Sequence, residues 1–198
     1  MNEASQGLDL GAFKHVVVPI GVIIGLGVAR IVMSVSQYIQ QRERVRFSAV
    51  HALWSGLLFV LFLGAWWILW GLSHAQAERW SFFAMIYLVV GPALIYLPSI
   101  LLLPEVPEEG SLDLGALLDG FARTMLLSVV AFVVWLVGAE MYLLREPFWI
   151  PKRTTHIVVA GALLVGAAFP SRRMTGIVGS VALVAVLVSL ATVRARLS

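Results

Sequence analysis

The sequence predicts an all-α fold, a polytopic transmembrane bundle of about six helices. Of its 198 residues, 60% are hydrophobic and only 13% are charged, whereas a soluble domain carries about 25% charged residues. The mean hydropathy is +0.93, and the apolar residues form long continuous runs, unlike the alternating pattern of a membrane strand. The composition excludes a disordered chain, and the absence of cysteine excludes a disulfide-stapled domain. We therefore expect a single integral membrane domain over residues 1–198.

The predicted spans are the apolar runs that reach, or nearly reach, the roughly 20 residues needed to cross a hydrocarbon core. They are Val16–Tyr38, Ser48–Leu72, Trp80–Leu103, Phe121–Leu144, Thr154–Phe169 and Met174–Val193. The fifth is short, since its purely apolar part is Ile157–Phe169, so the alternative is five spans plus one re-entrant segment. The third contains Gly91–Pro92 and Pro98, and we expect it to be kinked or broken there.

Two connections between the spans carry opposite charge. The first contains Arg42, Arg44 and Arg46, and the longest, Pro104–Gly120, has five acidic residues and no basic one. An arginine-rich first loop favours a cytoplasmic loop and an N-terminus outside the cell. The other basic residues leave this orientation open, because they divide almost evenly between the two sides.

The segment before the fourth span has helical periodicity of its own. Leu114, Leu117, Leu118 and Phe121 fall on one helical face, which predicts a short helix on the membrane surface. At the start of the span, Arg123 follows Asp119 by four residues, and this spacing predicts an ion pair between them.

The first span carries the strongest polar candidate, Arg30. Ser34, Gln37 and Gln41 follow it at i+4, i+7 and i+11, so the four side chains form one stripe along the helix. A polar stripe avoids lipid and faces the bundle or a hydrated crevice. The functional interpretation is an anion-attracting or gating arginine in a pathway. The structural alternative is an arginine that extends along its own stripe to the interface.

The opposite flank of the same span is lined by small residues. Gly21, Gly25 and Ala29 are spaced four apart, a pattern that lets another helix approach closely. We therefore expect the first span to be a central helix with two packed faces.

Glu140 and His51 are the other ionisable candidates within spans. Glu140 lies one turn from the end of the fourth span, near Arg145, Lys152 and Arg153, where it is either a proton carrier or half of an interfacial ion pair. A pair with Arg30 is not expected, because the two residues fall on opposite sides of the midplane. His51 opens the second span as a pH sensor or an ordinary interfacial residue. The histidines lack metal-ligand spacing.

Aromatic residues gather at the span ends of one side. Such a ring is typical of a membrane–water interface, and a ligand-stacking cluster is the alternative. Its members are Trp66, Trp67, Trp70, Trp80, Trp149, Phe82, Phe83, Tyr142 and Phe148.

The first half of the chain resembles a family of small bacterial multi-pass membrane proteins of unknown function. Those proteins have a glycine-rich first span with an arginine, a basic loop, and an aromatic–His–x–x–Trp entry to the second span. The matching residues here are Gly25, Gly27, Arg30, Arg44, Arg46, His51, Trp54, Trp66 and Trp67. Ala49 and Val50 stand before the histidine, where the family has an aromatic residue. The resemblance covers residues 20–100 and implies an integral membrane location, without an activity. We expect this location to be the cytoplasmic membrane of a bacterium.

The sequence contains no pattern that names a reaction. Nucleophile-elbow, P-loop, dinucleotide-binding and H-E-x-x-H motifs are all missing, so we expect no enzyme, no catalytic residue, no cofactor and no metal. The leading hypothesis is a small transporter or channel-like protein that uses the Arg30 stripe. The alternative is a membrane scaffold or accessory subunit that docks through small-residue helix faces. Expected partners are the lipid bilayer and a second copy or another membrane protein, and no nucleic acid.

Overall fold

The computed structural model describes residues 3–72, 82–143 and 147–194, with side chains described for residues 17–67, 82–143, 147–150 and 153–189. This part of the chain forms six helices and two very short strands. They are α1 (Glu3–Gln40), β1 (Val45–Arg46), α2 (Ala49–Leu72), α3 (Phe82–Leu102), β2 (Leu112–Asp113), α4 (Leu114–Leu143), α5 (Pro151–Ala168) and α6 (Arg172–Arg194). The predicted all-α bundle is confirmed.

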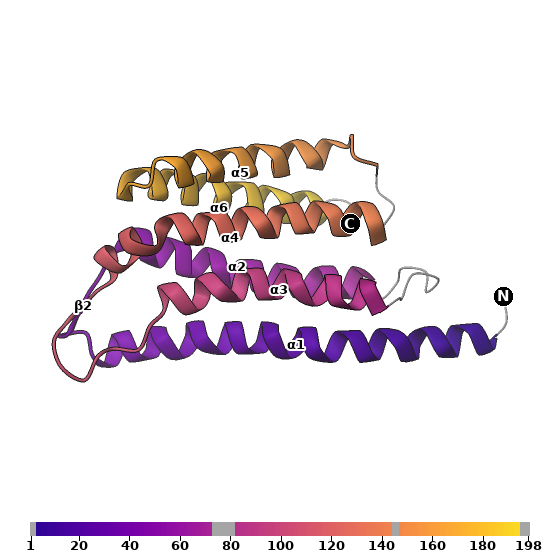
Figure 1. Cartoon of the computed structure of the whole chain (residues 1–198), viewed down its shortest axis with the longest axis horizontal. Coiled ribbons are helices and arrows are strands. Elements are labelled where there is room, and N and C mark those ends of the chain that lie inside the picture. The colour runs from indigo at the N-terminus through magenta and orange to yellow at the C-terminus, as the bar shows by residue number, and fades with distance from the viewer. Residues whose placement is uncertain (1–2, 73–81, 144–146, 195–198) are drawn as a thin grey trace.

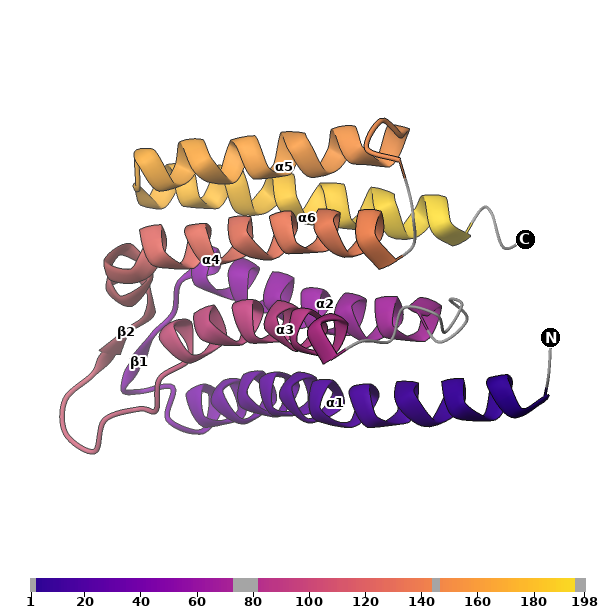
Figure 2. The same ribbon diagram turned by 45° about the vertical axis from the view of Figure 1, so that its right-hand side comes forward.

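The helices lie side by side, and each runs opposite to the one before it. α1 forms one edge of the bundle and α5 the other, with α2 and α3 next to α1 and with α4 and α6 next to α5 (Figures 1 and 2). One end of the bundle holds β1 and β2, and we call it the clasp end. The other holds the starts of α3 and α5, and we call it the terminal end.

The helices have the length and composition of membrane spans. Five are long and apolar enough to cross a bilayer, within α1, α2, α3, α4 and α6. The apolar part of α5 is shorter, Arg153–Ala168. α5 is one uninterrupted helix beside α4 and α6 (Figure 1), and its crossing of the membrane as a sixth span stays a prediction. The chain is therefore a multi-pass integral membrane protein.

The separate surface helix expected before the fourth span is wrong. α4 starts at Leu114 and continues without interruption to Leu143. Leu114 and Leu118 are buried in the bundle, at 3% and 0% exposure. The helix can start there because the Asp113 carboxylate accepts hydrogen bonds from the Gly115 and Ala116 N–H groups, each at 2.9 Å, which satisfies two free donors of the first turn.

The third span is not broken at Gly91–Pro92, and the expected kink stays a prediction. α3 is a single helix that contains both Pro92 and Pro98. Gly91 serves packing instead, since a Cβ there would collide with the Trp135 ring of α4. The Trp135 Nε1 donates to the Tyr87 carbonyl (2.6 Å) and the Tyr87 hydroxyl donates to the Trp135 carbonyl (2.7 Å). This reciprocal pair joins α3 to α4.

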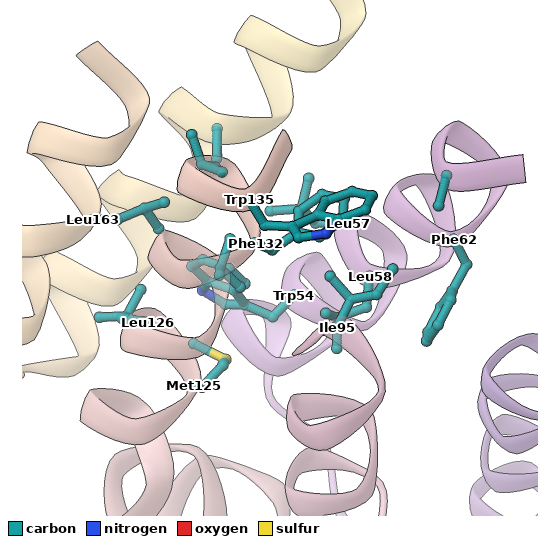
Figure 3. Packing of buried hydrophobic residues seen from close by; sticks show 14 of the residues in the cluster. Trp54, Leu57, Leu58, Phe62, Ile95, Met125, Leu126, Phe132, Trp135 and Leu163 are labelled. Carbon is teal, nitrogen blue, oxygen red and sulfur yellow. The ribbon is translucent and has the colours of Figure 1, made fainter. Parts of the chain in front are cut away.

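The core lies between α2, α3 and α4, with contributions from α5 (Figure 3). Trp54 of α2 is fully buried, and its Nε1 donates to the Thr175 carbonyl of α6 (3.1 Å). Because lipid is as apolar as the protein interior, close packing and interhelical hydrogen bonds of this kind hold such a bundle together.

Candidate functional site

The Arg30 stripe faces into the bundle and binds the end of α3. The Arg30 Nη2 donates to the Leu103 carbonyl at 2.8 Å, and the Ser34 Oγ donates to the same carbonyl at 3.3 Å. One turn further on, the Tyr38 hydroxyl donates to the Pro104 carbonyl at 2.8 Å. The last carbonyls of a helix have no partner within that helix and carry partial negative charge. Arg30 and its neighbours therefore supply the hydrogen bonds and the positive charge that the end of α3 needs.

His51 of α2 binds the same helix end from the other side. Its ring is 2% exposed, and Nε2 lies 2.6 Å from the Leu102 carbonyl. A carbonyl only accepts, so Nε2 is the protonated nitrogen. This burial does not fit an ordinary interfacial histidine, and the pH-sensor interpretation stays a prediction.

The position of the α3 end explains why so many donors meet there. α3 stops beside Arg30, ten residues before α1 ends at Gln40, which is about 15 Å along the axis. Pro104 follows the helix and disfavours its continuation. Irregular backbone at membrane depth requires protein partners, and the stripe provides them. Gln37 and Gln41 continue it as half-buried side chains.

The basic first loop and the acidic connection bind each other at the clasp end. β1 and β2 pair in parallel, with Val45 opposite Leu112 and Arg46 opposite Asp113. The Arg44 side chain donates to the Gly110 carbonyl (3.3 Å) and to the Glu108 carbonyl. Arg46 Nη1 lies 3.8 Å from Asp113 Oδ2. We call this contact the clasp. The arginines thus have a structural role that the sequence analysis did not foresee.

The Asp113 carboxyl of the clasp lies outside the membrane-spanning helices. The hydrogen bond from Ala116 N–H lowers its pKa most, and the Gly115 N–H and the Arg46 and Arg172 charges lower it further, against the opposing effect of desolvation. Asp113 is therefore a stable anion at neutral pH, which suits its roles in starting α4 and in holding Arg46.

The buried charges of the bundle lie at the terminal end, between α4 and α5. Arg153 Nη1 donates to Glu140 Oε2 at 2.6 Å, and His156 Nδ1 lies 3.8 Å from the same oxygen. We call these three residues the charge cluster. The side chain of Arg153 is only 1% exposed. Of the two interpretations of Glu140, its geometry is that of an ion pair, yet one buried far more deeply than an interfacial pair.

Helical spacing explains how the cluster forms. Arg153 and His156 lie three residues apart in the first turns of α5, so both side chains fall on one face. Glu140 lies on the buried side of α4, beside Ala139 and one turn from Leu143. The antiparallel contact of α4 and α5 brings these faces together. The sequence analysis named Arg153 only as a loop base near Glu140.

The small-residue ridge of α1 has no close helix partner at Gly25 or Ala29 among the residues that the structure describes. Gly25 and Ala29 are exposed, and a Cβ at Gly25 would meet nothing within 4 Å. A Cβ at Gly21 would only touch the Trp66 ring, at 3.4 Å. The expected central position of the first span is therefore wrong, because α1 lies at an edge of the bundle (Figure 2).

Gly27 is the glycine of α1 that packs closely, although it entered the sequence analysis only through the family resemblance. It is buried, and a Cβ there would collide with the Phe62 ring of α2. The signal was available, since Gly27 lies three residues after Ile24 and four before Ile31, both buried. The next position of the same helical face, three residues after Ile31, is the buried Ser34.

Asp119 has a different partner from the one predicted. Its carboxylate binds Arg172 at the start of α6, at 2.7 Å from Nη2 and 3.4 Å from Nε. The pair is about half-exposed. Arg172 lies against Gly115 of α4, where a Cβ would collide with its guanidinium. The predicted i,i+4 partner, Arg123, is exposed.

Across the described residues, no group of three or more His, Cys, Asp or Glu side chains could hold a metal ion. A scan against protein-family models found no matching model, and searches of curated proteins and of solved structures found no match. The resemblance to the small bacterial family stays a prediction.

Proposed function

We propose that this integral membrane protein is a small transporter or channel-like protein and that its working centre is the charge cluster. The observation that carries the proposal is the Glu140–Arg153 contact of 2.6 Å, buried between two apolar helices. Ionisable residues inside membrane spans are rare, and where they occur they commonly mark ion or proton pathways. The Arg30 stripe is a weaker centre, since Arg30 Nη2 and Ser34 Oγ are already bound to the Leu103 carbonyl and no carboxylate pairs with Arg30 among the described residues.

Stability alone does not account for a buried ion pair. Removing the two charges from water costs several kcal/mol per ion, and apolar residues of similar volume stabilise a fold equally well or better. The bundle has such apolar packing throughout its core. A role in moving charge explains why α4 and α5 have Glu140 and Arg153 at these buried positions, although Leu and Met would fill a similar volume without the desolvation cost.

The order of exposure supports a proton-coupled step. The side chain of Arg153 is 1% exposed, that of Glu140 12% and that of His156 19%. His156 is thus the most exposed of the three side chains, and its Nδ1 lies 3.8 Å from the carboxylate. A proton that passes from the imidazolium to Glu140 neutralises the carboxylate and weakens its hold on Arg153. Two protonation states then favour two arrangements of α4 and α5, which is the kind of two-state element that coupled transport requires.

Proton flux into liposomes, followed with an entrapped pH-sensitive dye, tests the proposal. The informative variant is Glu140→Leu/Arg153→Met, because it removes both charges and approximately keeps the buried volume. The matched control is Asp119→Asn/Arg172→Gln, which removes the half-exposed pair between α4 and α6. We expect the proton flux through wild type and through the control to exceed that of protein-free liposomes. The flux through the charge-cluster variant should fall to the level of protein-free liposomes. Equal flux through wild type and the charge-cluster variant contradicts the proposal.

We also propose the cytoplasmic membrane of a bacterium, with the N-terminus outside and the clasp end in the cytoplasm. Because the chain has no cysteine, a single cysteine at the exposed Glu109 reports this directly. A membrane-impermeant thiol reagent should label it in inverted vesicles and not in intact cells. The reverse labelling pattern contradicts the orientation.

A scaffold or accessory subunit is the second candidate, and the outward ridge of α1 favours it. Gly25 and Ala29 form a flat strip on a membrane-spanning helix, which suits close contact with another helix. A photo-crosslinking residue at Gly25 should then give a discrete adduct with a different membrane protein. The same residue at Val134, 62% exposed on α4, is the control. Adducts containing only this chain, or none, contradict a scaffold that docks a foreign partner.

A further inference from the structure

One edge of the Arg153 guanidinium is buried without an acceptor. Nη1 is bound to Glu140, whereas Nε and Nη2 have no hydrogen-bond partner among the described residues. The side chain is 1% exposed, so water does not take the place of a partner. Nε–H and the adjacent Nη2–H point in parallel, as the two-pronged edge that arginine presents to two oxygens of one anion.

The charge cluster does not use this edge itself. The Glu140 oxygen bound to Arg153 is Oε2, and it also faces His156 at 3.8 Å. Burying donors of a charged group without acceptors is strongly unfavourable. The acceptor that fits this edge is therefore a separate, negatively charged group with at least two oxygens.

The surroundings favour a phosphate-type anion. Arg153 lies in the first turn of α5, which starts at Pro151, and the start of a helix attracts negative charge. Phe148 and Trp149, just before it, are 37% and 84% exposed. Exposed aromatic residues at the end of a membrane helix mark the level of the lipid headgroups, and the phosphate groups of lipids lie there.

We propose that the Nε–Nη2 edge of Arg153, beside Glu140 and at the start of α5, binds a phosphate-type oxyanion, either the phosphate of a lipid headgroup or free phosphate. The anion reaches the edge by displacing the side chains that cover it. This inference names the ligand class of the charge cluster and rests on the proposed function for the role of the site, but it is tested by binding in the absence of any transmembrane gradient.

The first measurement is native mass spectrometry of the full chain, delipidated in neutral detergent and then mixed with phosphatidylglycerol or with diacylglycerol of the same acyl chains. Wild type should retain phosphatidylglycerol preferentially. Arg153→Lys keeps the charge beside Glu140 but lacks the two-pronged edge, so retention should fall at least about tenfold, as expected when a bidentate charged contact is lost. Arg173→Lys, an exposed arginine at the clasp end, is the matched control and should behave as wild type.

A second measurement separates the two sources of the anion. Inorganic phosphate is added to the detergent-solubilised proteins, and the unfolding temperature is compared with that in sulfate-free, phosphate-free buffer of equal ionic strength. Stabilisation of wild type but not of Arg153→Lys, with no lipid selectivity, assigns the site to free phosphate. Selective lipid retention without this stabilisation assigns it to a headgroup.

The inference is overturned if wild type retains the two lipids equally and phosphate does not stabilise it, or if Arg153→Lys matches wild type in both measurements. Glu140→Leu/Arg153→Met serves if Arg153→Lys does not fold, because it removes the edge together with its buried counter-charge. Binding without flux overturns only the transport proposal, whereas flux without binding overturns only the ligand class.

Discussion

Arg30 and Arg153 are both arginines in apolar helices, and the bundle accommodates them in different ways. Arg30 is half-buried near the clasp end and donates to the main-chain carbonyl of Leu103, the residue directly after α3. Arg153 is fully buried at the terminal end and binds the Glu140 carboxylate. Helix-end carbonyls carry only partial charge, so Arg30 keeps its net charge, whereas Arg153 is neutralised. Both arginines thus have an acceptor inside the bundle, a main-chain carbonyl for Arg30 and a carboxylate for Arg153, and only the carboxylate balances the charge.

The largest effect should come from breaking the ion pair at one partner. Glu140→Leu leaves Arg153 buried without its counter-charge, and we expect a loss of about 3–5 kcal/mol in the free energy of unfolding. Adding Arg153→Met should recover most of that loss, because the pair is then replaced by apolar volume. Unfolding of the single and double variants in detergent measures both effects. A double variant as unstable as the single one would show that the pair itself holds α4 to α5.

A smaller loss is expected at Arg30. Arg30→Met removes one charge-assisted hydrogen bond to the Leu103 carbonyl, a bond type worth about 1.5–3 kcal/mol, and partial exposure of the side chain places the effect at the lower end. The same unfolding assay tests this, with Arg42→Met in the exposed part of the first loop as control. A loss as large as that of Glu140→Leu would contradict the contrast between the two arginines.

The donors at the end of α3 should act together. His51→Leu leaves the buried Leu102 carbonyl without its partner, which costs about 1–3 kcal/mol. Combined with Arg30→Met, the effects should deviate from additivity by about 0.5 kcal/mol or more, because both residues bind adjacent carbonyls of one helix end. A double-mutant cycle measures the coupling. Strict additivity would mean that the stripe and His51 fix the α3 end independently.

The smallest effect concerns pH and the clasp. The pKa of Asp113 in the folded chain lies below its ordinary value of 3.8, so its contribution to stability is fully present above that value and is lost as the pH falls through the folded pKa. Asp113→Asn should therefore lessen the loss of stability on acidification below pH 3.8 without altering the response near neutrality. Thermal unfolding of wild type and variant across this range checks the sign. An unchanged acid response would show that other carboxyls dominate.

Sequence patterns predicted the helices well and their partners poorly. Apolar runs located the spans because crossing a bilayer requires a minimum apolar length, and this holds whatever the neighbours are. The stripe of Arg30, Ser34, Gln37 and Gln41 was correctly expected to avoid lipid, since its helical period follows from spacing alone. The prolines of α3 do not break the helix, which continues through both Pro92 and Pro98, and the kink expected from them stays a prediction.

The candidate site was only half predictable. Glu140 could be named because a carboxylate within a predicted span is unusual. Arg153 could not be singled out, because it lies with other basic residues in the connection before the predicted fifth span. Which of those bases turns inward depends on where α5 starts and how it faces α4. The small ridge of Gly25 and Ala29 was assigned to packing, yet Gly27 makes the contact with Phe62. From the sequence alone, the faces of α1 that carry Gly25 and Gly27 cannot be told apart, because the choice between them depends on where α2 lies.

The sequence by itself determined that this chain is a multi-pass helical membrane protein with few charges inside its spans, because bilayer thickness and backbone hydrogen bonding act on each segment separately. The partners of four of these charges follow from the three-dimensional packing alone: a helix end for Arg30, Glu140 for Arg153, Arg172 for Asp119 and the acidic connection for Arg44. The members of these pairs lie from 13 to 73 residues apart along the chain, and helix packing together with the pairing of β1 and β2 brings them within hydrogen-bond distance.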